Sequence, residues 1–194
     1  DNARLELEEA NYISSQIAVF YNDLNSKALD AMATNDLSYN DVGAYLFLRR
    51  IQADRSTFAN PLGHNPLTAD ETLAGLRKRL GEKRYGAIES SMSKYRDLRE
   101  SYVFPKVEEA GMYPAELMDE VKENRDYAKF SVSKYLEDKF GGTTSAHIHR
   151  QVGTQSEIEN PFIATVLQDV SMLRAAKINT VKRSVIDSLA KEGI

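Results

Sequence analysis

The sequence predicts an all-α protein, an irregular bundle of about six or seven helices whose first, middle and last members are long. Two observations lead to this fold class. Apolar residues recur at intervals of three and four along most of the 194-residue chain, which is the spacing of one helix face. Residues that favour helix ends divide this pattern into segments. A hydrophobic content of 42%, with ten Gly and five Pro, fits a folded, soluble chain.

The first two helices are expected at about residues 4–33 and 39–54. Ser38, with Asp41 three residues later, is the expected N-cap of the second. The connection between the two is short, which favours antiparallel packing. Because the second helix carries apolar side chains on almost every side, we expect it to form the buried centre of the fold.

A turn-rich loop is expected at residues 58–66, which contain two Asn-Pro pairs and a glycine. Thr68 and Glu71 then predict a reciprocal cap, in which each side chain bonds the backbone N–H of the other residue. A short helix to about Leu80 follows.

The middle helix is expected from Gly81 to about Ala110. Pro105 has no N–H to donate and clashes with the preceding turn, so it predicts either a kink or a break between two shorter helices. Gly111 is the expected C-terminal stop. Pro114 is suited to the first turn of a further helix.

The last helix is expected to begin with Asn160 as its cap and Pro161 as its first residue. The pattern before it, over residues 124–151, mixes helical and strand periods. A helix this long either pairs with the first helix or projects to meet a partner, and we expect its first half in the core and its second half in contact with another molecule. Its apolar stripe comprises Val166, Val170, Leu173, Val181, Val185 and Leu189, of which the last three are the candidate partner contacts.

Composition limits the function classes. The chain has no cysteine, which excludes disulfides and thiolate chemistry, and its net charge of −4 gives no overall attraction to nucleic acid. No apolar run reaches the length of a membrane span, about 18 residues. We expect a single domain over residues 1–194, with 1–124 and 125–194 as alternative sub-lobes. The start at Asp1, without a methionine, suggests either a processed protein or, as we favour, a piece of a longer protein.

No catalytic or cofactor-binding constellation is complete. His147 and His149 are the only histidine pair, and they are weak metal candidates because their spacing faces one side only in an extended segment. Adjacent carboxylates are plentiful but are typical of solvated helix faces. We therefore expect no enzyme, no metal and no cofactor.

Basic clusters give the alternative function, a nucleic-acid-binding helical domain. The candidate phosphate contacts are Arg77, Lys78, Arg79, Lys83 and Arg84. A weaker patch lies at residues 177–183. The nearby Tyr85 and Tyr95 lie on an apolar stripe, so we expect them in the core rather than stacked on bases.

The run from Arg150 to Thr154, the segment Glu157 to Phe162, and Ala175, Ala176 and Asn179 resemble part of a known family. These are the polyvalent proteins of phages and prophages, very large chains in which helical modules separate enzymatic domains. The resemblance covers about residues 125–190 and transfers no catalytic residue. It implies a non-catalytic interaction or scaffold module, cytoplasmic or phage-associated, with a protein partner or self-association.

Overall fold

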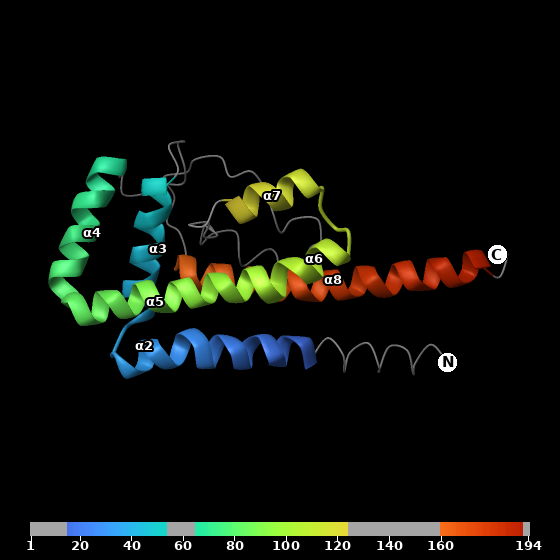
Figure 1. Ribbon diagram of the computed structural model, residues 1–194, viewed down its shortest axis with the longest axis horizontal. Coiled ribbons are helices and arrows are strands. Elements are labelled where there is room, and N and C mark those ends of the chain that lie inside the picture. The colour runs from blue at the N-terminus through green and yellow to red at the C-terminus, as the bar shows by residue number, and fades with distance from the viewer. Residues whose placement is uncertain (1–14, 54–64, 124–159, 192–194) are drawn as a thin grey trace.

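The computed structural model describes residues 15–53, 65–123 and 160–191, and within these ranges the chain forms six continuous helices and no strand (Figure 1). The all-α fold class is confirmed, as are the long first, middle and last helices. The first helix runs from residue 15 into η1 and α2, where η denotes a π-helical turn. The bounds are η1 (Asn25–Leu29), α2 (Asp30–Thr34), α3 (Tyr39–Ala53), α4 (Pro66–Leu80), α5 (Glu82–Leu98), η2 (Arg99–Val103), α6 (Phe104–Glu109), α7 (Ala115–Glu123) and α8 (Pro161–Lys191).

The continuous helix α5–η2–α6 is the axis of the molecule. The first helix lies along α5, α8 packs against η2 and α6, and α3 packs against α4 and α8 (Figure 1). The expected antiparallel pairing of the first two helices is wrong. In Figure 1 α3 runs across the direction of the first helix, because its apolar faces pack against α4 and α8.

Helix α3 forms part of the buried centre, as its sequence predicts. Val42, Tyr45, Leu48 and Ile51 are all buried, and they point to more than one side of the helix. Ala44 is the exception, since it is exposed. Burying one large apolar side chain contributes about 1.5 to 3 kcal/mol, so α3 is a major source of stability for its length.

Two predicted helix starts are confirmed. At α3 the Ser38 Oγ accepts a hydrogen bond from the Asp41 N–H at 3.1 Å. At α8 the Asn160 Oδ1 accepts one from the Phe162 N–H at 3.0 Å, and Pro161 is the first helical residue. Each side chain satisfies a backbone donor that the first turn leaves without a partner.

The predicted start of α4 is wrong by three residues. Pro66 opens the helix and Asn65 is its N-cap, with the Thr68 N–H donating to Asn65 Oδ1 at 2.9 Å. The Thr68 hydroxyl accepts from the Asn65 N–H at 2.8 Å, so Thr68 is the second member of the reciprocal cap and not the first. The Asn-Pro pair is the earlier and stronger start signal, because proline is suited to the first turn.

Pro105 neither breaks the middle helix nor ends it. The π-helical turn η2 precedes it, and the Phe104 N–H donates to the Arg99 carbonyl, five residues back. The wider turn relieves the crowding between a proline ring and the carbonyl four residues earlier. The predicted stop at Gly111 is confirmed, since α6 ends at Glu109 and Gly111 has a φ of 62°.

Several sequence predictions fall on residues outside the described ranges. These are the segment 124–151, the histidines His147 and His149, and the part of the family resemblance that precedes Asn160. Among the described residues, no helix is both long and apolar enough to cross a membrane.

Candidate functional site

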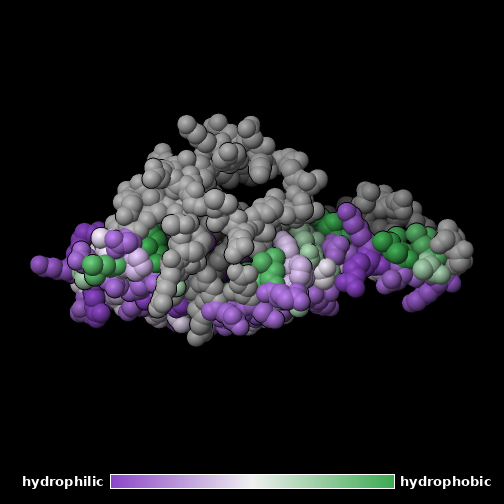
Figure 2. Space-filling view, turned by 90° about the horizontal axis from the view of Figure 1, so that it is seen from above, coloured by the Kyte–Doolittle hydropathy of each residue, from purple (hydrophilic) through white to green (hydrophobic). Residues whose placement is uncertain are grey.

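The three predicted partner contacts lie on the C-terminal half of α8, which extends beyond α6 (Figure 1). Val185 is 47% exposed and Leu189 is 43% exposed, whereas Val181 is half-buried. Ile186, which the sequence stripe omitted, is 63% exposed. Apolar side chains are visible over this end of the molecule in Figure 2.

The N-terminal half of α8 is embedded in the core. Phe162, Met172, Leu173 and Ala176 are each at most 2% exposed. From residue 182 to residue 191 every side chain is exposed. The first half of α8 therefore lies in the core, as predicted, and the helix projects from the core toward its C-terminal end.

The core face of α8 differs from the predicted stripe. Val166 and Val170 are only half-buried at its edge. The buried row advances by three and four residues and mixes apolar with polar side chains: Phe162, Thr165, Asp169, Met172 and Ala176. A prediction from apolar residues alone leaves out Thr165 and Asp169. It therefore places the core face on the side of Val166 and Val170, at the edge of the face that is buried.

Two polar side chains continue this row and form the last contacts with α6. The Asn179 Nδ2 donates to the Ala110 carbonyl at 2.7 Å, and the Arg183 Nη1 donates to the same oxygen at 3.2 Å. This carbonyl lies just beyond the last residue of α6, where backbone acceptors lack helical partners and the helix dipole favours a cation. A β-carbon on Gly111 would lie 2.8 Å from the Arg183 Nη1, so glycine also permits this close approach.

A buried polar cluster joins α8 to the middle helix. Asp169 is fully buried, accepts a hydrogen bond from the Tyr95 hydroxyl at 2.6 Å and lies 2.9 Å from the Arg99 Nε. Burial raises the pKa of the Asp169 carboxyl, and the charge of Arg99 and the hydrogen bonds from Arg99 and Tyr95 oppose that rise. Burial also raises the pKa of the Tyr95 hydroxyl well above its ordinary value.

This cluster has the composition of a catalytic site but not its accessibility. Tyr95, Arg99 and Asp169 are at most 5% exposed, so a substrate would reach them only if the core opened. Arg99 also lies over the Phe104 ring, 5.0 Å from its centroid. The arrangement positions α8 against the middle helix.

No family model, curated protein sequence or solved structure matches this chain. The resemblance to helical modules of polyvalent proteins stays a prediction.

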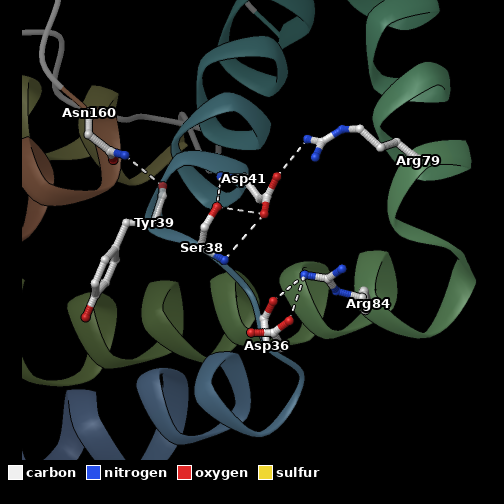
Figure 3. Close-up of polar contacts among 7 residues, drawn as sticks. All are labelled: Asp36, Ser38, Tyr39, Asp41, Arg79, Arg84 and Asn160. Atoms are coloured by element: carbon white, nitrogen blue, oxygen red, sulfur yellow. Dashed lines mark hydrogen bonds and ion pairs between the residues drawn. The ribbon is translucent and has the colours of Figure 1, made fainter.

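The residues from Asn160 to Phe162, which belong to the segment that carries the family resemblance, connect the start of α8 with α3. Besides capping α8, Asn160 donates from Nδ2 to the Tyr39 carbonyl at 2.7 Å (Figure 3). A β-carbon on Gly43 would lie within 2.7 Å of the Asn160 side chain, so the two are in close contact. The Tyr39 and Phe162 rings stack with their centroids 6.0 Å apart. The Asn-Pro-Phe sequence therefore fixes the start of α8 on the start of α3.

The arginines of the predicted phosphate-binding run have acidic partners within the chain. The Arg77 Nε lies 2.8 Å from a Glu82 carboxylate oxygen, and the Arg79 Nη2 lies 2.7 Å from the Asp41 Oδ1. Arg84 contacts Asp36 (Figure 3). Three of the five cations therefore connect parts of the fold: Arg77 connects α4 with α5, Arg79 connects α4 with α3, and Arg84 connects α5 with the turn after α2.

The other two residues of this run, Lys78 and Lys83, are exposed. Tyr85 and Tyr95 are buried, as expected, and are not presented for stacking on bases. Phosphate contact at residues 77–84 stays a prediction.

Asp41 is the acceptor at the centre of this set. Burial favours its neutral form, but hydrogen bonds from Ser38 and Arg79 outweigh burial and hold the pKa of its carboxyl below the ordinary value of 3.8. The same carboxylate accepts from the Ser38 hydroxyl at 2.7 Å, so it joins the cap of α3 to α4. Its charged form is the one the fold stabilises.

No group of three or more potential metal ligands is present among the residues that the structure describes. The weak metal candidates His147 and His149 lie outside those residues, so metal binding there stays a prediction.

Proposed function

We propose that this chain is a non-catalytic helical interaction or scaffold module, part of a protein derived from a phage or another mobile element, and that its contact surface is the projecting end of α8, residues 178–191. The observation that carries this proposal is the exposure of Val185, Ile186 and Leu189 on a helix that extends beyond the other described helices.

Single exposed apolar residues are ordinary on protein surfaces, but a helical row of them is typical of a contact site. Ile178 and Val181, which are half-buried, and Val185 and Leu189, which are exposed, follow one another at intervals of three and four, and we call these four residues the apolar row. The body of the chain does not require this extension for its core, because the buried side chains of α8 end at Ala176.

The proposal includes the absence of a catalytic role. The buried cluster of Tyr95, Arg99 and Asp169 supports this part, although its residue types are those of many catalytic sites. Tyr95, Arg99 and Asp169 satisfy one another inside the core, which is the arrangement of a structural network. The arginines of the basic run likewise have acidic partners, which favours the interaction module over the nucleic-acid alternative.

Site-specific photo-crosslinking tests this function. A photoreactive amino acid is placed at Val185 in the full chain, and the matched control carries it at Glu71, an exposed residue of α4. We expect a discrete protein adduct, with another protein or a second copy, at Val185 and not at Glu71 in cells that express the parent gene. Equal labelling at the two sites, or no adduct at Val185, would contradict the proposal.

A further inference from the structure

The C-terminal part of α8, which is the projecting end and the turn before it, carries charge of the opposite sign to the rest of the chain. Residues 174–191 contain five cations and one acid, which gives a net charge of +4. Because the whole chain carries −4, the remaining residues carry −8. The cations are Arg174, Lys177, Lys182, Arg183 and Lys191, and the acid is Asp187.

These charges are not distributed evenly around the helix. Arg174 precedes Ile178 by four residues and so lies on the side of the apolar row, and Lys182 follows Ile178 by four residues beside the row. Both cations are exposed. Asp187 lies four residues after Arg183, which is turned toward α6, so the one acid is on the other side of the helix.

We propose that the projecting end of α8 docks an amphipathic helix of another protein whose apolar stripe is flanked by acidic residues. This inference rests on the proposed function and names the partner of that surface. Apolar residues at intervals of three and four pack against a second helix as in a coiled coil, and the charges beside the seam decide which partner is accepted. Here those charges are Arg174 and Lys182, so carboxylates on the partner complement them.

A second copy of the chain fits this surface less well. Residues 178–191 contain three cations and one acid, so pairing two projecting ends would bring +2 against +2, which opposes association. Four apolar side chains also fall well short of the roughly 20 to 30 residues that each partner contributes to a stable interface of standard size. A short contact strengthened by opposite charge is the better match.

An anionic membrane surface and nucleic acid are also less well matched. Helices that lie on membranes are typically rich in Trp, Phe and Leu on the apolar face, whereas residues 174–191 contain no aromatic residue and one leucine. Binding to a phosphate backbone would use the cations but leave the apolar row exposed to water.

A displayed library of amphipathic helices tests the inference with the full chain as the target. Each peptide has about four heptads with a fixed apolar stripe, and its flanking positions are an equal mixture of Glu, Gln and Lys. We expect the selected peptides to carry Glu at these positions more often than Gln or Lys. A selected peptide should bind about fivefold more weakly to Arg174→Glu or Lys182→Glu, because each reversal exchanges an attraction for a repulsion. Lys94→Glu on α5, at an exposed lysine, is the matched control and should bind as the parent does.

The variant Val185→Ser/Leu189→Ser separates the two proposals. If peptides require Val185 and Leu189 but carry Gln or Lys as often as Glu, the acidic partner is wrong and the contact surface stands. If selected peptides bind this variant as tightly as the parent chain, the contact surface itself is wrong. Self-association that the variant abolishes, measured by analytical ultracentrifugation, would replace the acidic partner by a second copy. Tighter binding to vesicles of phosphatidylcholine and phosphatidylserine than to any selected peptide would replace it by a lipid surface.

Discussion

Replacing Asp169 by alanine should destabilise the protein by about 3 kcal/mol, because it removes the charge that compensates Arg99 inside the core. The Arg99 side chain is 6% exposed and the Asp169 side chain is fully buried, and the carboxylate lies 2.9 Å from the Arg99 Nε. Breaking a buried ion pair from one side costs about 3 to 5 kcal/mol. The lower end applies here, since Arg99 keeps its contact with the Phe104 ring at 5.0 Å.

The loss is measured by urea and thermal unfolding at pH 7, followed by circular dichroism. For a chain of this length each kcal/mol corresponds to about 2 to 4 °C, so the Tm of Asp169→Ala should fall by about 6 to 12 °C. Asp187→Ala is the matched control on the exposed half of the same helix, and its free energy of unfolding should stay within about 0.5 kcal/mol of the parent.

A double variant distinguishes the lost charge pair from simple loss of packing. In Asp169→Leu/Arg99→Met neither charge is buried, so most of the stability should return. A loss below about 1 kcal/mol for Asp169→Ala would refute the view that the pair is buried and mutually dependent. So would a double variant that is less stable than the single one.

Three further predictions concern contacts between helices. Gly43→Ala should lower the free energy of unfolding, measured by urea titration, by about 1 to 3 kcal/mol, because its β-carbon would lie within 2.7 Å of the Asn160 side chain. The control is Gly86→Ala, at a helical glycine with no atom near the added β-carbon. It should raise the free energy of unfolding by about 0.5 to 1 kcal/mol. Asp41→Asn should be less stable than the parent at pH 7 by about 1 kcal/mol in the same titration. The difference should shrink as the pH falls below 3.8, because a carboxyl with a lowered pKa contributes stability above its ordinary value and loses it as the pH falls through the folded value. Asn179→Ala should speed amide hydrogen exchange in the last three turns of α8 and leave α5 unchanged, because it removes a hydrogen bond to α6.

The helices themselves could be predicted from the sequence wherever the signal is local. The cap at Asn160, the buried centre around α3 and the stop at Gly111 each depend on a few adjacent residues, and each is confirmed. The start of α4 was misplaced for a reason that is also local, since Asn65 and Thr68 both have the chemistry of a cap and the proline decides between them.

The core face of α8 could not be predicted in the same way. Asp169 is a surface residue by every local criterion, and it is buried because Tyr95 and Arg99 lie opposite it on a helix about 70 residues earlier in the chain. The π-helical turn before Pro105 is similar, because a proline predicts a disturbance without deciding whether the helix kinks, breaks or widens. Both depend on tertiary packing. Val185 and Leu189 are exposed, as expected for a last helix that is longer than a compact domain needs.

Polar contacts fix the register of α8 against its neighbours from Asn160 to Arg183. Asn160 bonds α3, Asp169 bonds the middle helix, and Asn179 and Arg183 bond the end of α6. Apolar packing alone would tolerate a shift of one helical turn, whereas hydrogen bonds and an ion pair at three levels are satisfied in one register. Beyond Arg183 the helix continues for eight residues, about 12 Å at 1.5 Å per residue. Because the register is fixed below this point, the direction in which Val185 and Leu189 face is fixed as well.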